Sequence, residues 1–134
     1  MRKTVKQAKG VMGEKWAEQW MQRQGYQILH RNWRSGHYEI DLVCTDGKKI
    51  VFVEVRSHFC ATKSFPESSV WLLKQTSVQR GTRKYISENK IQLPVRQDVV
   101  GIRFSPWGKQ LLHIPDAFNL RTSISVTHSS KLYH

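Results

Sequence analysis

The chain has 134 residues, a length that suits one domain with one hydrophobic core. Hydrophobic residues make up 39% of it, including five Trp, four Tyr and five Phe, which excludes a disordered chain. There are 22 Lys and Arg against 10 Asp and Glu, so the formal net charge is +12. This excess favours a polyanionic partner, nucleic acid first, with a merely solvated basic surface as the alternative.

The sequence contains no recognisable membrane or lipidation signal. The N-terminal "MRKTVKQAKG" is basic but is not followed by an apolar stretch, and the longest apolar run falls far short of a membrane span. The two cysteines, Cys44 and Cys60, lack the spacing of a zinc site. We therefore expect a cytoplasmic protein that does not bind membranes.

The first predicted element is a helix over residues 5–24, which Gly25 ends. Its apolar side chains recur at helical spacing: Met12, Trp16, Ala17, Trp20 and Met21. A strand is expected in "YQILHRNWR", followed by a hairpin in "GHYEIDLVCTDGKKIVFVEVR", residues 36–56. The pair Asp46-Gly47 predicts a two-residue turn, which would place Asp41 opposite Phe52 and Glu39 opposite Glu54.

The second half predicts a loop over 59–68 and a helix that Ser68 or Ser69 caps and that runs to Asn89. Its inward positions are Trp71, Lys74, Val78, Gly81 and Tyr85. Strands follow in "QDVVGIRF" and "KQLLHI", joined by the turn "SPWG". The prediction is an α/β domain over residues 1–119 with the order α-β-β-β-α-β-β and a mixed central sheet of about five strands flanked by helices. Residues 120–134 form a tail that frays or adds "SISV" as an edge strand.

Three carboxylates interrupt the apolar runs of the predicted hairpin. Alternation places Glu39, Asp41 and Glu54 on one face, with Ile40 and Leu42 on the other. Asp41 and Glu54 would be diagonal neighbours roughly 7 Å apart, so both can reach one hard divalent cation such as Mg²⁺ or Mn²⁺. The alternative is an ion pair with Arg56 or Lys74 that only holds the fold together.

Glu14 lies at the border of the apolar stripe of the first helix. Two interpretations of this position stay open. The side chain points across the sheet toward the carboxylates, or it pairs with a neighbouring base or is solvated.

Asp41, twelve further residues and then Glu54-Val55-Arg56 resemble the PD-(D/E)XK nuclease motif. With "GEKWAEQWMQRQGYQILHRNWR" before it and "RQDVVGIRFSPWGKQLLHIPDAF" after it, the chain resembles the YraN family of uncharacterised bacterial proteins over residues 13–118. The motifs that carry the resemblance are Gly13-Glu14, Gly25-Tyr26, Arg31-Asn32, Glu39-Ile40-Asp41-Leu42, Phe52-Val53-Glu54-Val55-Arg56 and Asp98-Val99-Val100. The family is similar to archaeal Holliday-junction resolvases, which implies a single restriction-endonuclease-like domain.

The resemblance implies a catalytic set of Glu14, Asp41, Glu54 and Arg56. It implies an Mg²⁺ or Mn²⁺ site built from Asp41, Glu54 and the Val55 carbonyl, and it supports an inward direction for Glu14; Glu39 is a further candidate ligand. A lysine normally occupies the position of Arg56, which is always protonated and can only donate. Lys74, on the inward face of the second helix, is our hypothesis for a replacement, with a solvated helix lysine as the alternative.

The expected partner is nucleic acid, DNA rather than RNA. The predicted phosphate contacts are Arg2, Lys3, Lys6, Lys9, Arg80, Arg83, Lys84 and Lys90. Trp33 and Trp107 are candidates for stacking on unpaired bases, although packing in the core is favoured for each.

The predicted function is a divalent-metal-dependent endonuclease acting on DNA phosphodiesters, at branched or single-stranded structures. Paired cuts on a symmetric junction would require a homodimer. The alternatives are a non-catalytic nucleic-acid-binding protein with a relic nuclease site and a protein-interaction scaffold. Metal dependence distinguishes the first possibility from the others.

Overall fold

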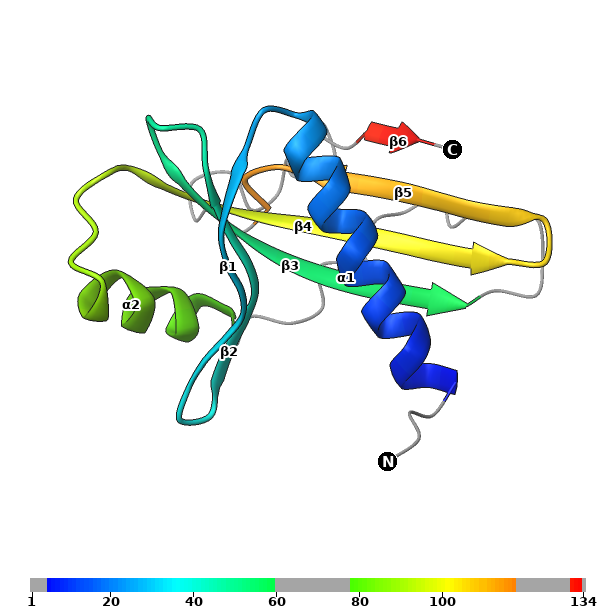
Figure 1. The fold of residues 1–134 in the computed structure, drawn as a ribbon, viewed down its shortest axis with the longest axis horizontal. Coiled ribbons are helices and arrows are strands. Elements are labelled where there is room, and N and C mark those ends of the chain that lie inside the picture. Colours follow the sequence, from blue (N-terminus) through cyan, green and yellow to red (C-terminus); the bar gives the residue numbers. More distant parts are fainter. Residues whose placement is uncertain (1–4, 60–77, 118–130, 134) are drawn as a thin grey trace.

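The computed structural model describes residues 5–59, 78–117 and 131–133, with side chains described in 12–59 and 81–117. These residues form two helices and six strands: α1 (Val5–Arg23), β1 (Gln27–Ser35), β2 (Tyr38–Thr45), β3 (Ile50–Phe59), α2 (Val78–Glu88), β4 (Val95–Ser105), β5 (Gly108–Ile114) and β6 (Lys131–Tyr133). The predicted α/β class and the order of its seven elements are confirmed (Figure 1). The predicted start of the second helix lies outside the described residues.

The strands form one mixed sheet in which spatial order follows chain order, β1 to β6. Neighbouring strands are antiparallel except β3 and β4, which are parallel. Parallel neighbours require a crossover connection, and α2 lies in that connection. The sixth strand, β6, falls within the predicted tail and pairs with β5, whereas the segment "SISV" lies outside the described residues.

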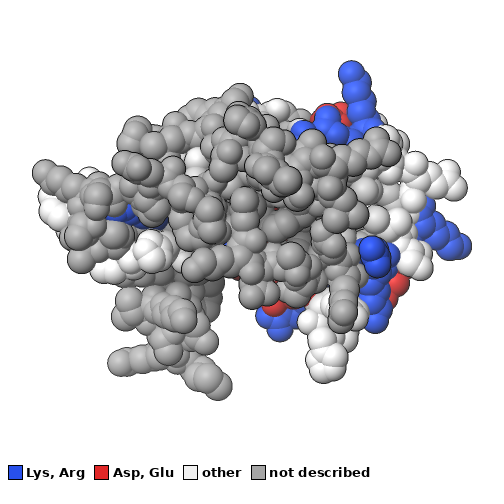
Figure 2. Space-filling view, turned by 180° about the vertical axis from the view of Figure 1, so that it is seen from behind, with Lys and Arg blue, Asp and Glu red and all other residues white. Residues whose placement is uncertain are grey.

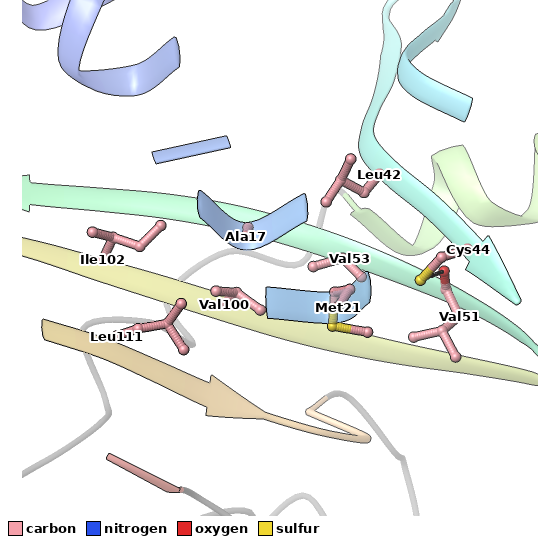
Figure 3. Close-up of a cluster of buried hydrophobic side chains, with 9 residues drawn as sticks. All are labelled: Ala17, Met21, Leu42, Cys44, Val51, Val53, Val100, Ile102 and Leu111. Carbon is pink, nitrogen blue, oxygen red and sulfur yellow. Dashed lines mark hydrogen bonds between the residues drawn. The ribbon is translucent and has the colours of Figure 1, made fainter. Parts of the chain in front are cut away.

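Helix α1 crosses one face of the sheet, over β3 and β4 (Figure 1). Beneath it lies a core of nine buried side chains: Ala17, Met21, Leu42, Cys44, Val51, Val53, Val100, Ile102 and Leu111 (Figure 3). The prediction that Met12 belongs to this stripe is wrong, because its side chain is 51% exposed. Gly13 lies against the hydroxyl of Ser57 on β3, and Met12 is turned about 100° from it around the helix.

Helix α2 packs on the opposite face, as alternation along β3 shows. Phe52 contacts Tyr85 of α2 at 5.5 Å between ring centroids, while the adjacent Val51 and Val53 belong to the α1 side. Tyr85 and Gly81 are buried, which confirms the inward positions predicted for them. Trp33 packs edge-on against Tyr85, with 5.1 Å between the ring centroids. This confirms the core packing that was favoured for Trp33 over base stacking.

The backbone of α2 approaches β2 closely at Gly81, but the space there admits a methyl group. A Cβ at this position would lie 3.5 Å from Ile40 Cγ1, an ordinary van der Waals distance. Gly81→Ala should therefore raise the free energy of unfolding by about 0.5–1 kcal/mol, because alanine loses less backbone entropy in a helix. Urea unfolding measures it. Gly36→Ala is the matched control and should destabilise, since Gly36 has φ +61.

The β4–β5 turn matches its prediction, with Ser105 paired to Gly108 across two turn residues. Trp107 is 57% exposed, so the core packing favoured for it is wrong. The tip of a two-residue turn projects beyond the sheet and cannot insert its side chain between the layers. Among the described residues, neither helix is apolar over a stretch long enough to cross a membrane.

The β2–β3 connection differs from the predicted two-residue turn. It spans residues 46–49, and the Asp46 Oδ1 accepts hydrogen bonds from the backbone N–H of Lys48 and Lys49 at 2.9 and 3.0 Å. This longer turn shifts the register by two residues, so that Leu42 pairs with Val53. The predicted pairs of Asp41 with Phe52 and of Glu39 with Glu54 are therefore wrong. The faces of β3 are unchanged, because a shift of two preserves alternation.

Candidate active site

The candidate site lies where the β2–β3 ladder ends. Asp41 and Glu54 are each one residue beyond the last pair, Leu42 and Val53, and are thus opposite rather than diagonal. The Asp41 carboxylate Oδ2 accepts a hydrogen bond from the backbone N–H of Val55 at 2.7 Å. The N–H and C=O of an extended residue point toward the same neighbouring strand, so the Val55 carbonyl also faces β2.

Strand β2 twists at Asp41. Ile40 packs on the α2 side and Leu42 on the α1 side, although residues two apart in a regular strand share a face. The prediction that Ile40 and Leu42 share a face is therefore wrong, because the strand twists between them. On β1, the residue between their partners is Asn32, whose φ of 50° breaks the extended conformation. Asn tolerates this left-handed region better than most side chains.

Asp41 borders two cavities, one lined mainly by β2 and β3 and the other by α1, β1 and β2. A cavity of about 270 Å³ is lined by Glu39, Asp41 and Glu54, among others. A second cavity of about 140 Å³ is lined by Asp41 with Glu14 and Arg31. Glu14 therefore lies on the face of α1 that is turned toward Asp41, in the direction that the family resemblance implied.

The carboxylates interact through space. Burial raises the pKa of Asp41 from 3.8 to about 7; the hydrogen bond from Val55 opposes this shift, and the charges of Glu14, Glu39 and Glu54 add to it. A carboxyl group with so high a pKa is uncommon outside functional sites. A cation placed among these four groups would reverse the shift and favour their ionised forms.

Glu54 and Arg56 form an ion pair along β3. Arg56 Nη2 donates to Glu54 Oε2 at 2.9 Å, and both side chains are less than one-fifth exposed. Burial raises the pKa of Glu54, and the Arg56 guanidinium partly offsets that effect. The ion pair with Arg56 that the sequence offered as an alternative role for Glu54 is therefore present. It does not extend to Asp41, whose hydrogen bond comes from the Val55 backbone.

The other predicted residues lie around this centre or beyond the described part of the chain. Glu39 is exposed and forms an ion pair with Arg34 of β1, with 3.3 Å between Glu39 Oε1 and Arg34 Nη2. Lys84 Nζ lies 5.6 Å from the Tyr38 ring centroid, and Arg83 is exposed on α2. The remaining predicted positions are Lys6, Lys9 and Arg80, on helices but with undescribed side chains, Lys90, exposed after α2, and Arg2, Lys3 and Lys74, outside the described residues.

The charged surface is visible from behind the molecule (Figure 2). The α2 side of the molecule, at the left in Figure 1, is at the right in Figure 2, where several Lys and Arg side chains lie near a few Asp and Glu side chains. Acidic and basic groups are therefore interspersed there rather than separated into one uniform basic patch.

The donor set fits a hard divalent cation in its chemistry, because Asp41 and Glu54 line one cavity and the Val55 backbone is bonded to Asp41 beside it. Among the described residues, however, no three His, Cys, Asp or Glu side chains already stand close enough together to hold a metal ion. Water molecules commonly complete the coordination of Mg²⁺, so two carboxylates suffice for such a site.

A buried network around Asp98 was not predicted as a site. Asp98 is fully buried and accepts hydrogen bonds from Arg96 Nε and Nη2, both at 2.7 Å. His113 Nε2 lies 2.8 Å from Asp98 Oδ2, and its Nδ1 accepts a hydrogen bond from Trp20 Nε1 at 3.0 Å. This acceptor role leaves the His113 proton on Nε2, where it donates to Asp98. The network thus ties α1 to β4 and β5.

Two signals in the sequence indicated this network. Asp98 interrupts an apolar strand, in "QDVVGI", and His113 interrupts another, in "LLHI". A charged or polar residue at a core position requires a buried partner. What the sequence does not contain is the pairing itself, because Trp20 and His113 are 93 residues apart.

Comparison with known proteins gives a consistent result. Residues 13–102 match the profile of Uncharacterised protein family UPF0102. A UPF0102 protein of Anaeromyxobacter dehalogenans is 37% identical over 115 residues, covering 85% of this chain and 86% of its own. UPF0102 proteins of Geobacter metallireducens and Thermodesulfovibrio yellowstonii are 37% and 38% identical, covering 83% and 81% of this chain and 92% and 94% of their own. The chain therefore belongs to Uncharacterised protein family UPF0102.

Proposed function

We propose that this protein is a divalent-metal-dependent endonuclease of the PD-(D/E)XK type that hydrolyses DNA phosphodiesters. The observation that carries the proposal is the meeting of Asp41 and Glu54 at the end of the β2–β3 ladder, with the pKa of Asp41 raised to about 7. Such a cluster is costly without a cation, and the chain carries only 10 acidic residues against 22 basic ones. A site for a cation explains this cost better than stability does.

Asp41, Glu54 and the Val55 carbonyl would hold Mg²⁺ or Mn²⁺ in this proposal, with Glu14 and Glu39 beside them. When bound, the ion lowers the pKa of water and neutralises charge on the phosphate. Arg56 donates hydrogen bonds to the phosphate but cannot accept a proton. Lys74 is proposed as the basic group that supplements it.

The proposed substrate is DNA in a branched or single-stranded form, bound through its phosphates by the basic residues of α1 and α2. Phosphate contacts give affinity without reading base sequence, so recognition would depend on the structure of the DNA. For paired cuts on a symmetric junction, two copies of the chain would act as a homodimer.

The deciding experiment is cleavage of labelled duplex, single-stranded and four-way-junction DNA with Mg²⁺, Mn²⁺ or EDTA. We expect metal-dependent cutting by the wild type. Asp41→Asn and Glu54→Gln should each reduce its rate at least about 100-fold, because each removes a charge that the metal requires. Both substitutions keep the shape of the side chain, so the fold should remain intact.

Glu88→Gln is the matched control for these variants. Glu88 is an exposed carboxylate on α2 whose Oε1 accepts a hydrogen bond from Ser35, away from Asp41. This variant should cut like the wild type. Cutting that survives in EDTA, or that is unchanged by Asp41→Asn, would contradict the proposal.

The second candidate function is non-catalytic binding of nucleic acid. The Glu54–Arg56 ion pair favours it, since Glu54 is already partly neutralised within the protein. Binding without cutting, equal in the wild type, Asp41→Asn and Glu54→Gln, would support this alternative.

A further inference from the structure

Two large aromatic side chains lie exposed at one end of the sheet. Phe59 is the last residue of β3 and is 53% exposed, and Trp107, at the tip of the β4–β5 turn, is 57% exposed. Phe59 pairs with Phe104, three residues before Trp107, so both residues belong to the same end of the sheet. The end of β3 and the β4–β5 turn lie at the right in Figure 1. Large aromatic side chains are enriched at binding surfaces, where they supply apolar contact area.

This aromatic end is connected to the candidate active site through β3. Val55 donates its N–H to Asp41, and alternation places Val55, Ser57 and Phe59 on the same side of the strand. Ser57 lies against Gly13, the neighbour of Glu14 on α1. Val55 and Phe59 are four positions apart along β3, about 13 Å. A strand of a few nucleotides is long enough to span that distance, and it would have to pass around α1, which covers Val55 and Ser57 on this face.

The surroundings of the aromatic end are basic. Lys109, next to the turn, is exposed, and its Nζ lies 2.8 Å from the centroid of the Trp16 ring. The N-terminal half of α1, which includes positions 6 and 9, both lysine, runs beside the end of β3 (Figure 1). Aromatic rings flanked by cations bind single-stranded nucleic acids, because bases stack on the rings while phosphates meet the cations.

We infer that Phe59 and Trp107 form a stacking surface for the unpaired bases of a nucleic-acid strand. This inference deepens the proposed function and rests on it for the position of the strand, whose phosphodiester would lie at Asp41. Bases in an intact duplex have their faces covered by their neighbours and cannot stack on these rings. The surface therefore selects substrates that contain a single-stranded segment.

The test measures equilibrium binding of labelled oligothymidylate and of a labelled duplex, both in EDTA so that no cleavage occurs. Phe59→Ala and Trp107→Ala should each weaken oligothymidylate binding about 5- to 100-fold and leave duplex binding unchanged. Trp107→Phe keeps a ring and should retain most of the affinity. Leu93→Ala is the control, since Leu93 is 43% exposed beyond the opposite end of β4.

A second measurement does not depend on how the alanine variants fold. Oligothymidylate should quench tryptophan fluorescence in the wild type, and this quenching should be reduced in Trp107→Phe. Unchanged oligothymidylate affinity in both alanine variants would overturn the inference, as would an equal loss of duplex binding. Because binding is measured without metal, a protein that never cuts DNA can still give the expected result, so the inference and the proposed nuclease activity are tested separately.

Discussion

Asp98→Ala is expected to lower the free energy of unfolding by about 3–5 kcal/mol, the cost of breaking a buried ion pair by removing one partner. Asp98 is fully buried, so its loss leaves the charge of Arg96 without a compensating carboxylate and the Nε2–H of His113 without its acceptor. The bond from Trp20 to His113 would be weakened as well, which loosens α1. Urea unfolding at neutral pH measures the change.

The control for this substitution is Glu88→Ala. That carboxylate is exposed and accepts one hydrogen bond, from Ser35, so its loss should cost less than about 1 kcal/mol. Equal losses for the two variants would show that the Asp98 network contributes no more than a surface contact.

The Asp98 network also predicts a pH dependence. Burial alone would raise the pKa of Asp98, but hydrogen bonds from His113 and Arg96 lower it below its ordinary value of 3.8. A carboxyl group with a lowered pKa in the folded state stabilises the protein above the unfolded pKa. The stability advantage of the wild type over Asp98→Asn should therefore shrink as the pH falls below 3.8.

Unlike Asp98→Ala, the substitution Asp41→Asn should raise the free energy of unfolding at neutral pH. The pKa of Asp41 is 3.8 in an unfolded chain and about 7 in the fold, so the folded state binds its proton more tightly. That preference stabilises the fold fully below 3.8 and is lost as the pH rises to about 7. Between these two pH values, the free energy of unfolding of the wild type should fall by on the order of 4 kcal/mol relative to that of Asp41→Asn.

Thermal or urea unfolding of the two proteins at a series of pH values checks this result. Asparagine does not titrate and has nearly the same shape, so it isolates the charge. Parallel stability curves for the two proteins between pH 4 and pH 8 would contradict the raised pKa. Glu14→Gln should reduce the pH dependence in part, because the Glu14 charge is one of those that raise the pKa of Asp41.

Metal binding can be read from the same measurements. A divalent cation at the proposed site would bind the ionised carboxylates, so Mn²⁺ or Mg²⁺ should raise the unfolding temperature of the wild type most at alkaline pH. The same addition should have little effect on Asp41→Asn. A metal effect of equal size in both proteins would place the cation elsewhere.

Local features of the sequence predicted the elements well, because their signals are contained in short segments. The spacing of Trp16, Trp20 and Met21 predicts α1, and Gly25, with φ 95°, ends it as expected. The carboxylates Asp41 and Glu54 stood out because they interrupt apolar strands in a basic chain. They were predicted as a candidate site from composition, alternation and the family resemblance, with a register that the structure corrects.

The register itself was decided by the tertiary structure. A four-residue connection places Leu42 opposite Val53, and the sequence "TDGKK" does not distinguish it from a two-residue turn, because both use Asp and Gly. The consequence is that Asp41 and Glu54 lie opposite each other. The twist at Asp41 coincides with the left-handed backbone of Asn32 in the neighbouring strand, and the two cavities that Asp41 borders are lined by several elements.

By itself, then, the sequence determined the order of the predicted helices and strands, many of their inward positions and the acidic residues at issue, because these depend on periodicity within one segment. Only the tertiary structure decided which side chains meet. Trp20, Asp98 and His113 come from three elements, and Phe59 and Trp107 lie at the same end of the sheet because β3 and β4 are parallel and in register. Contacts between distant segments depend on packing and register, which no single segment encodes.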